Sequence, residues 1–414
     1  MDYRQAIDFI EGASGKGDKR GLYNMERLME RLGNPHKRLR AFHVAGTNGK
    51  GSICAFLDSS LRAAGYRTGL YTSPHLERFN DRMRLNGRPI SDERLAEVTT
   101  RVAEQVEILR GEGVLPTFFE ICTAVAFEFF AEENVDYAVI EVGLGGRRDS
   151  TNVITPMVSV IASIGFDHMK TLGSTLPEIA GEKAGIIKPG VPVVISPHEV
   201  RSVFAARCEE LNSPLIDLGT SAMQMIFEDE RGGEFSLKLG DSEWPRIAIS
   251  LPGAHQAANA CLALTALDRL NLDMSRAGEG VSRAKWPGRL EWVGNVLIDG
   301  AHNPQGARAL KTYAEKHLKD RRVVLLTGMM QDKQHALCAD IFSSFADEIV
   351  TTSVSWPRAL DAFKLAEDYH GRAVSEASVP AALSRARRMA GEDGAIVVAG
   401  SIYLAGDVRR LLLP

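Results

Sequence analysis

Hydrophobic positions along the chain follow two spacings, and segments of the two kinds alternate. Continuous apolar runs at residues 41–45 and 158–164 are typical of buried strands. Apolar residues spaced three or four positions apart at 22–32 and 91–110 predict amphipathic helices. The same patterns predict further strands at 67–71 and 136–142 and further helices from Lys50 and at 121–130, 180–186 and 254–270. Buried strands that alternate with helices predict an α/β fold with a mostly parallel sheet.

The pattern changes at residues 217–251, where apolar and polar residues alternate one by one. This period of two predicts a small, half-exposed antiparallel addition to the sheet. After a break at Gly294-Asn295, a new strand and helix series begins. Its strands are expected at 296–298, 323–327, 348–352 and 395–399, and its helices at 305–317, 334–346 and 379–390. We therefore expect a large domain at 1–294 and a smaller, Rossmann-like α/β domain at 295–414.

The charge balance of the chain excludes a broad basic surface. The 414 residues carry 49 Lys and Arg against 53 Asp and Glu, so we expect no nucleic-acid partner, although a local basic pocket fits this balance. The N-terminus has no apolar signal core, and no run approaches the ~18 apolar residues of a membrane span. Five dispersed cysteines without a C-x-x-C pair are typical of reduced thiols. These features predict a cytoplasmic protein with no membrane partner.

A glycine-rich loop connects the strand at 41–45 to the next helix. It reads Gly46-Thr47-Asn48-Gly49-Lys50-Gly51-Ser52. Glycines let several backbone N–H groups face one phosphate, and the helix N-terminus adds its positive dipole end. Lys50 would neutralise the outer phosphates and Ser52 would reach a magnesium ion, although Gly51 between them departs from the strict phosphate-loop spacing. The alternative is a turn that binds nothing, but the order of strand, glycines, lysine, hydroxyl and helix favours a phosphate site.

Further short strings accompany this loop along the chain. They are Tyr71-Thr72-Ser73-Pro74-His75, Arg78-Phe79-Asn80-Asp81-Arg82, Glu141-Val142-Gly143-Leu144-Gly145-Gly146, Asp149-Ser150-Thr151-Asn152, Asp167-His168, Glu182-Lys183-Ala184-Gly185-Ile186-Ile187-Lys188, Pro287-Gly288-Arg289-Leu290-Glu291, Asp299-Gly300-Ala301-His302-Asn303-Pro304 and Gly400-Ser401-Ile402-Tyr403-Leu404. With the loop, they resemble the ATP-dependent amide ligases of the Mur ligase superfamily, most closely the dihydrofolate synthase/folylpolyglutamate synthase branch. So many strings in one order make the resemblance specific, and it extends over essentially the whole chain.

The resemblance implies magnesium ions beside the phosphate loop, with Ser73, Glu141 and His168 among their ligands. Glu141 lies at the end of an apolar strand, where a carboxylate needs a partner and where parallel sheets collect ligands. The alternative for Glu141 is a structural salt bridge. His168 follows another strand at the same edge, but a lone histidine is more often structural, and magnesium prefers oxygen.

The resemblance also implies that Lys183 is carbamylated by CO₂ and that the resulting anion holds a second magnesium ion. Carbamylation requires the neutral amine, so a desolvated lysine with a lowered pKa is needed. Small and apolar residues surround Lys183 in the sequence, although by itself the sequence favours a solvated lysine. The predicted catalytic residues are Lys50, Lys183 and His302.

The resemblance assigns further residues to the nucleotide and to a pterin. The nucleotide contacts are Asn48, Gly49, Lys50, Gly51, Ser52, Asn259, Arg289 (phosphate) and Asp299 (ribose). For each of the last three, taken singly, a cap or surface residue is the favoured interpretation. The pterin-side residues are Thr117, Phe118, Phe119, Glu120, Arg148, Asp149 and Ser150, and His302 and Ser401 are candidates near an incoming glutamate. An aromatic pair beside a carboxylate suits a flat heterocycle, whereas the alternative places Phe118 and Phe119 on the core side of a helix capped by Thr117 and Glu120.

The predicted function is ATP-dependent ligation of L-glutamate to dihydropteroate, to folates, or to both, through an acyl phosphate, by a magnesium-dependent monomer. The pterin-side set and His75 incline us to both substrates, and the resemblance implies γ-linkage. One alternative in the same class joins an amino acid to a cell-wall precursor. An alternative in another class is a phosphate-loop switch NTPase, which needs neither the second α/β domain nor a pterin pocket.

Overall fold

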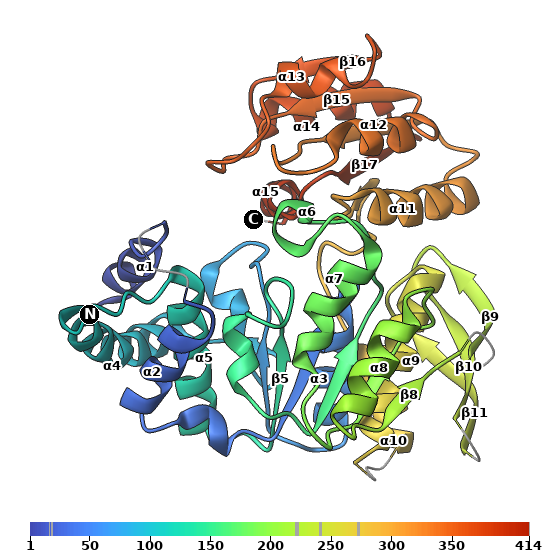
Figure 1. Ribbon diagram of the computed structural model, residues 1–414. Helices are drawn as coiled ribbons and strands as arrows, with labels where there is room; N and C mark the ends of the chain where they lie inside the picture. The colour runs from blue at the N-terminus through green and yellow to red at the C-terminus, as the bar shows by residue number, and fades with distance from the viewer. Residues whose placement is uncertain (16, 18–19, 220–222, 240–241, 271–273, 414) are drawn as a thin grey trace.

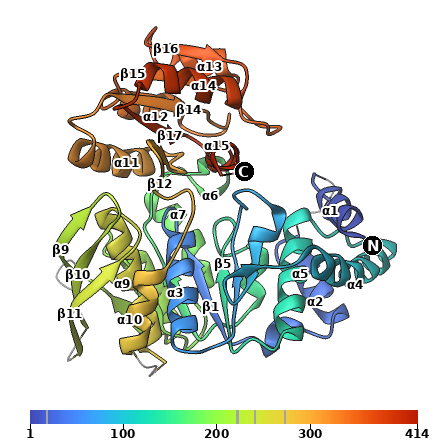
Figure 2. The ribbon, with the colours of Figure 1, turned by 180° about the vertical axis from the view of Figure 1, so that it is seen from behind.

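The computed structural model describes residues 1–15, 17, 20–219, 223–239, 242–270 and 274–413. Two α/β domains follow one another, and the smaller C-terminal domain sits over one end of the larger one (Figures 1 and 2). This arrangement agrees with the predicted fold class. None of the helices in these residues is long and apolar enough to cross a bilayer.

The large domain is built on an eight-stranded sheet in the order β4-β3-β2-β5-β1-β6-β7-β8. The strands are β1 Ala41–Ala45, β2 Thr68–Tyr71, β3 Met83–Leu85, β4 Arg88–Pro89, β5 Tyr137–Glu141, β6 Val158–Ile161, β7 Val193–Ile195 and β8 Leu215–Asp217. From β2 to β8 neighbouring strands are parallel, while β3 and β4 add an antiparallel edge. The central strands β1, β5 and β6 are buried along their whole length because helices cover both faces.

The two faces of this sheet form separate cores. Phe42 and Val44 point to one face, toward α3 Lys50–Ala63, α9 Ala254–Asp268 and α10 Met274–Arg283. Ala41 points to the other face, which is covered by α1 Tyr3–Glu11, α2 Tyr23–Arg31, α4 Asp92–Gly111 and α5 Phe118–Glu132. Farther along that face lie α6 Met169–Leu172, α7 Leu176–Lys183 and α8 Arg201–Glu210. The central strands are therefore shielded from water except at their ends, whereas the edge strands β4 and β8 are exposed or half-buried.

The predicted antiparallel addition is a three-stranded sheet in the order β11-β10-β9. It consists of β9 Met223–Asp229, β10 Gly232–Leu239 and β11 Ser242–Ile249. Phe235 and Leu237 face the core, and Met223 and Met225 pack against it, as the alternating pattern predicts. Phe227, on the same predicted face as Met223 and Met225, is exposed instead. Residues 220–222 and 240–241 of the predicted segment lie outside the described residues.

The C-terminal domain contains a six-stranded sheet in the order β12-β13-β17-β14-β15-β16, in which only β12 is antiparallel. Its strands are β12 Glu291–Val293, β13 Val296–Ile298, β14 Val323–Thr327, β15 Glu348–Thr352, β16 Ala373–Glu376 and β17 Ala395–Ala399. Its helices are α11 Pro304–His317, α12 His335–Ser343, α13 Ala362–Glu367, α14 Val379–Ala390 and α15 Ile402–Leu412. The strand β12 belongs to this sheet although it precedes the predicted domain boundary at 294/295. The exact position of that boundary stays a prediction.

Local signals predicted the helix starts better than the element ends. Thr117 forms the expected capping box with Glu120, and Thr175 forms a second one with Glu178. The helix predicted at 180–186 starts earlier, at Leu176, and turns into a 3₁₀ segment, Ala184–Ile186. The strand predicted over 158–164 ends at Ile161, because the following residues bend toward the glycine-rich loop, where Thr47 donates to the carbonyl of Ser163.

Candidate active site

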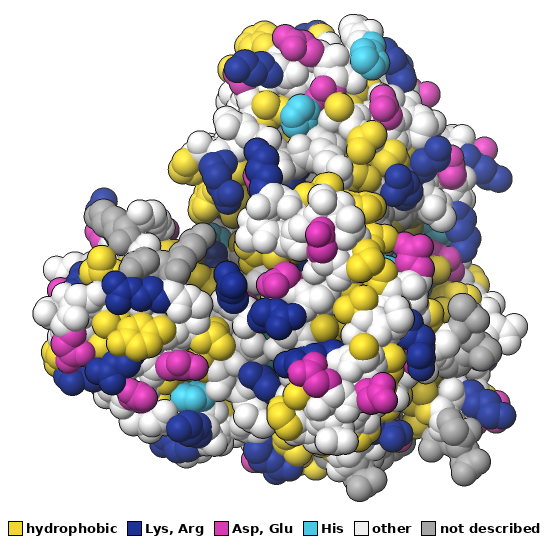
Figure 3. Space-filling view, viewed as in Figure 1, with side chains coloured by type: hydrophobic (Ala, Val, Ile, Leu, Met, Phe, Trp, Pro, Cys, Tyr) yellow, Lys and Arg dark blue, Asp and Glu magenta, His cyan; other side chains and the backbone are white. Residues whose placement is uncertain are grey.

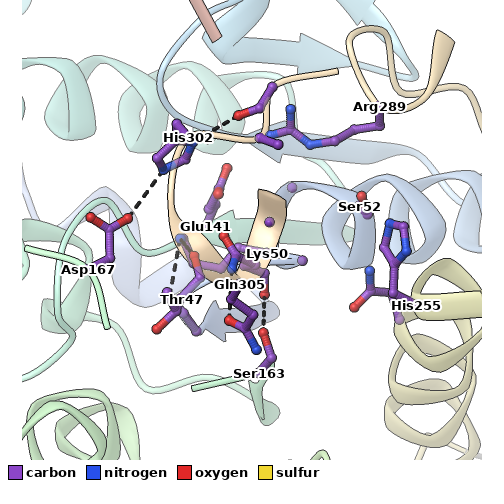
Figure 4. Close-up of a pocket in the computed structure, with 18 of the residues that line it drawn as sticks. Thr47, Lys50, Ser52, Glu141, Ser163, Asp167, His255, Arg289, His302 and Gln305 are labelled. Carbon is purple, nitrogen blue, oxygen red and sulfur yellow. Dashed lines mark hydrogen bonds and ion pairs between the residues drawn. The ribbon is translucent and has the colours of Figure 1, made fainter. Parts of the chain in front are cut away.

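The candidate site lies at the carboxyl ends of β1, β5 and β6, where the large domain meets the C-terminal domain. A cavity of about 350 Å³ opens there, and Figure 4 shows the side chains that line it. Ligands collect at this edge of parallel sheets because the loops that follow the strands converge there. The space-filling view shows a notch between the two domains, with Lys and Arg side chains along it (Figure 3).

The glycine-rich loop forms the floor of this cavity. Gly49 has φ +89°, a left-handed conformation that favours glycine, and its backbone leads directly into α3. The Lys50 ammonium donates to the carbonyls of Gly46 and Thr47, both at 3.2 Å, so the side chain folds back over the loop. The loop N–H groups, the start of α3 and the Lys50 charge therefore meet at one point, as a phosphate requires.

Two glycines of the loop also allow close packing against residues from far along the chain. A Cβ on Gly49 would lie 2.5 Å from Asn259 Oδ1, and one on Gly51 would lie 2.8 Å from Trp286 Nε1. Asn259 lines the cavity from α9 and donates to Gln256 Oε1 at 3.1 Å. The predicted nucleotide residue Asn259 is thus in direct contact with the loop.

Glu141 ends β5 inside the same cavity with only 5% of its surface exposed. Its Oε2 accepts a hydrogen bond from the backbone N–H of Ser73 at 3.0 Å, so two of the predicted magnesium ligands are neighbours. Burial raises the pKa of the Glu141 carboxyl, against the opposing charge of Lys50. Within the described part of the chain, Glu141 is thus held by a backbone N–H and not by the salt bridge considered above. A buried carboxylate held in this way is suited to act as a ligand for a cation.

The described residues hold no group of three or more His, Cys, Asp or Glu side chains arranged around one metal position. The donors present are the Glu141 carboxylate and the Ser73 hydroxyl, both of which line the cavity. Magnesium bound with nucleotides takes one or two protein oxygens and completes its shell with phosphate and water. These oxygen donors therefore fit a magnesium ion that is held largely by a nucleotide.

Lys183 is buried at the end of α7, not solvated, with 3% of its surface exposed. Its Nζ donates to the carbonyl of Gly46 at 3.0 Å and lies within the cavity. Burial, with the nearby charge of Lys50, lowers the pKa of the Lys183 amine to about 7. A substantial fraction of this amine is thus neutral at neutral pH, as carbamylation requires.

His168 lies on the loop after β6, beside residues of the C-terminal domain. Its Nε2 lies 3.2 Å from Lys333 Nζ and its Nδ1 lies 3.9 Å from Asp332. Burial and the charge of Lys333 lower the pKa of His168 to about 4, so the ring is neutral at pH 7. The neutral ring can act as a ligand, but in this arrangement it faces Lys333.

Arg289 and Asp299 line the cavity opposite the loop, on either side of the predicted domain boundary. Asp299 Oδ2 accepts from Leu290 N–H at 3.0 Å and Oδ1 from Ala301 N–H at 2.8 Å, which fixes the carboxylate. The Arg289 guanidinium donates to the carbonyl of Gly288 at 2.9 Å. The predicted nucleotide residues from 48 to 299 thus surround one cavity.

A second, wider cavity of about 730 Å³ adjoins the first. It is lined by all the predicted pterin-side and glutamate-side residues, which are Thr117, Phe118, Phe119, Glu120, Arg148, Asp149, Ser150, His302 and Ser401. Phe119 stacks on Tyr71 with ring centroids 6.1 Å apart, and the Arg82 guanidinium lies 5.4 Å from the Phe118 ring centroid. Both rings pack against the core and also line the cavity, so the two roles considered for them coexist.

Several of these polar residues also hold the local backbone. Glu120 Oε2 accepts from Thr117 N–H at 2.6 Å in the capping box of α5. Asp149 accepts from Thr151 N–H at 3.1 Å and from Leu144 N–H at 2.8 Å, and burial raises its pKa. Ser401 caps α15 by accepting from Tyr403 N–H at 3.1 Å. Any ligand contact by these groups is made from a position that the fold has already fixed.

The sequence analysis missed several residues that the fold brings to this junction. Asn303 and Gln305 accept from the Asn48 side-chain amide at 3.1 and 2.8 Å, linking the phosphate loop to the C-terminal domain. Asp167 and Lys333 form an ion pair of 2.6 Å between the domains. Asp167 precedes the predicted His168, which was a usable signal, but nothing in the sequence around Lys333 marks it.

Comparison with known proteins adds to this geometry. The family model for the Mur ligase middle domain matches residues 44–267, and that for the Mur ligase glutamate ligase domain matches residues 288–402. A curated relative from Bacillus subtilis, a dihydrofolate synthase/folylpolyglutamate synthase, is 39% identical over 99% of both chains. The chain belongs to the Mur ligase family. An Escherichia coli relative of the same description is 32% identical over 98% of this chain and 94% of its own.

Solved structures agree with this membership of the Mur ligase family. A Mycobacterium tuberculosis folylpolyglutamate synthase complexed with ADP superposes with a TM-score of 0.93 at 30% identity, covering 100% of this chain and 98% of that chain. The E. coli FolC protein in complex with DHPP and ADP superposes with a TM-score of 0.90 at 30% identity, covering 99% of this chain and 97% of that chain. The predicted family, the predicted ligase class and the α/β architecture are therefore confirmed.

Proposed function

We propose that this Mur ligase family member joins L-glutamate to dihydropteroate and to folate substrates with hydrolysis of ATP to ADP and phosphate. The observation that carries the proposal is the meeting of two cavities at the domain junction. One is built around a phosphate loop and the other around an aromatic pair and polar groups. Ser73, His168 and His302 line both cavities, so an ATP γ-phosphate in the first would meet a carboxylate in the second there. Relatives solved with ADP and with DHPP support this division.

The chemistry proceeds in two steps at that meeting point. The substrate carboxylate attacks the γ-phosphorus of ATP, which releases ADP and leaves an acyl phosphate. The glutamate amine then attacks the acyl carbon, and phosphate leaves as the amide forms. Lys50 and the loop N–H groups stabilise the charge on the transferring phosphate, a contribution that is typically large because the donors are already in position.

Magnesium would be held by Glu141 and Ser73 with the nucleotide phosphates, and His168 is the further ligand that family resemblance suggests. When bound, the ion neutralises phosphate charge during transfer. Lys183 is the proposed carbamate: its neutral amine attacks CO₂, the new N–C bond forms, and one proton is released to solvent. The anion would give this part of the cavity a further oxygen donor in place of an ammonium that repels a cation.

The wide cavity suits both organic substrates. Phe118 and Phe119 present ring faces for a flat pterin, beside the polar groups of Thr117 and Glu120. On the opposite wall, Lys333 and Arg358 of the C-terminal domain supply positive charge for the carboxylates of glutamate. We further propose that the enzyme works as a cytoplasmic monomer, a compartment that its five buried, unpaired cysteines suit.

Substrate-dependent ADP formation tests the proposal. The purified protein is supplied with ATP, magnesium and glutamate, together with dihydropteroate, a tetrahydrofolate, a cell-wall nucleotide precursor or no acceptor, and ADP and glutamylated product are measured. The proposal expects ADP and glutamylated product to form with dihydropteroate, and also with the tetrahydrofolate. Product with the wall precursor alone would favour the related Mur-type activity. ADP formation independent of any acceptor would favour a switch NTPase.

A further inference from the structure

A cluster of polar side chains from both domains lies where the two cavities meet. We name it the Asp167 cluster, and its members are Asp167, His168, His302, Asn303 and Lys333. Asp167 lies at its centre on the loop between β6 and α6, and only 9% of its side chain is exposed. The Asp167–His302 contact is visible in Figure 4.

The carboxylate of Asp167 takes three contacts from the C-terminal domain. Its Oδ2 accepts from His302 Nε2 at 3.2 Å and from Asn303 Nδ2 at 3.1 Å. Its Oδ1 accepts from Lys333 Nζ at 2.6 Å, an ion pair in which the lysine side chain is only 8% exposed. These donors come from two separate loops, one before α11 and one before α12, so Asp167 fixes both relative to the large domain.

The position of the cluster links it to the reaction. Asp167 lines the nucleotide cavity, Lys333 lines the wide cavity, and His168 and His302 line both. The other nitrogen of the His302 ring, Nδ1, lies 2.9 Å from the carbonyl of Gly300, so the ring is held at both nitrogens. The contacts to Asp167 exist only when the domains are together, because the carboxylate and its three donors belong to different domains.

We propose that Asp167 is a positioning residue that couples domain closure to glutamate transfer, by holding His302 and Lys333 across the junction and excluding water from it. This inference rests on the proposed function. A buried carboxylate with three donors is stable only when all of them are in place, so closure and assembly of the junction become one event. Domain closure that shields a reactive intermediate is a common use of such motions.

The reaction that the closed junction prevents is hydrolysis of the acyl phosphate. Water attacks the acyl carbon in place of the amine, and the bond from that carbon to the phosphate oxygen breaks. The products are the original carboxylate, inorganic phosphate and one proton, so ATP is consumed without amide formation. A loosened junction therefore lowers the number of glutamates ligated for each ATP consumed, even while ATP still reacts.

The test substitutes Asp167→Asn and measures ADP and glutamylated product in the same reaction with folate, glutamate and ATP. The amide matches the carboxylate in size but removes its charge and presents an N–H₂ group to donors. The matched control is Glu228→Gln on β9. Glu228 is also a carboxylate, 11% exposed, that crosses the domain interface, to Lys316 on α11 at 2.6 Å. It lines neither cavity.

We expect D167N to lower the ratio of glutamate ligated to ATP consumed about fivefold or more and to raise the KM for glutamate about tenfold, with the KM for ATP within about twofold of the parent. E228Q should keep the parental ratio. An unchanged ratio in D167N would overturn the inference, and so would an equal fall in both variants, which would indicate general weakening of the interface. If D167N does not fold, Asp167→Glu, which keeps the charge but displaces it by one methylene, is judged by the same ratio.

Failure of the proposed function gives a different result. In that case the parent protein itself forms no glutamylated product with any folate, and the inference falls with it. When the parent ligates glutamate, the ratio in D167N decides the inference alone.

Discussion

Lys183 Nζ donates to the carbonyl of Gly46 at 3.0 Å, across 137 residues of sequence. A buried amine at the end of α7 thus reaches the first glycine of the phosphate loop. This contact stabilises the loop, and burial at the same time makes the amine easier to deprotonate. One side chain therefore connects the stability of the loop with the proposed carbamylation beside it.

The first prediction concerns that modification. We expect Lys183→Ala to lose ligase activity about a hundredfold or more, because it removes the carbamate that would hold a cation near the phosphates. Lys183→Arg should not restore activity, since arginine keeps the wrong sign of charge. Acetate should partly rescue the alanine variant by filling the space left. The measurements are ligation rates with and without added acetate.

A matched measurement separates the carbamate from the hydrogen bond to Gly46. Mass spectrometry of the native protein under ¹³CO₂, or carbon NMR of the same sample, should reveal one labelled carbamate in the parent and none in Lys183→Ala. Full activity in Lys183→Arg, or an active parent without label, contradicts the prediction. The ligase assignment survives either result, because the phosphate loop and Glu141 do not depend on it.

Lys50 supplies the second prediction. Lys50→Ala should abolish ligation while leaving the fold intact, because it removes a charge-assisted contact worth on the order of 2–3 kcal/mol or more in the transition state, about a hundredfold in rate. Rates of ADP formation and a circular dichroism melt of the same sample check both parts. Near-parental turnover in the folded variant would contradict the phosphate-loop assignment.

Most of the candidate site could be predicted because its residues lie in local patterns. The loop from Gly46 to Ser52 follows a buried strand, and Glu141 ends another, so the parallel sheet brings them to one edge. The capping box of Thr117 and Glu120 located the start of α5, and with it the aromatic pair. These signals depend only on neighbours in sequence.

The contacts between the domains could not be predicted in the same way. Asp167 pairs with Lys333 across 166 residues, and no spacing or composition rule connects them. The burial of Lys183 is likewise a product of packing, since the sequence by itself favours a solvated lysine. The strands β7 and β8, three residues each, were not predicted either. So short a run carries little periodicity, and neither has the preceding Gly-Asn break that marked the equally short strand at 296–298.

The third prediction concerns the wide cavity. Phe118→Ala should raise the KM for dihydropteroate and for tetrahydrofolate about tenfold each, because it removes a ring face from the pterin side of the cavity. The KM for ATP should stay within about twofold, since Phe118 lines only the wide cavity. Initial rates with each substrate varied in turn provide the test. A shift for tetrahydrofolate alone would indicate that dihydropteroate binds elsewhere.

The last prediction concerns acid stability and His43, which is completely buried in β1. Its Nε2 lies 2.8 Å from Thr151 Oγ1, whose hydroxyl donates to Asp149 at 2.5 Å, so His43 Nε2 carries the proton of a neutral ring. The ring's Nδ1 has no hydrogen-bond partner within the described residues. Burial lowers the pKa of His43 to about 3 from an ordinary value of 6.5.

The sign of the effect follows from the two pKa values. Between pH 6.5 and about 3 the unfolded chain binds a proton at His43 that the folded chain does not, so stability falls as the pH falls through this range. The contribution approaches about 1.4 kcal/mol per pH unit. His43→Gln keeps a side-chain N–H donor for Thr151 but cannot titrate, so its free energy of unfolding should fall less steeply from pH 6.5 to pH 4.5. Urea unfolding of both proteins at several pH values measures the two slopes, and identical slopes would show that His43 is not the group that titrates.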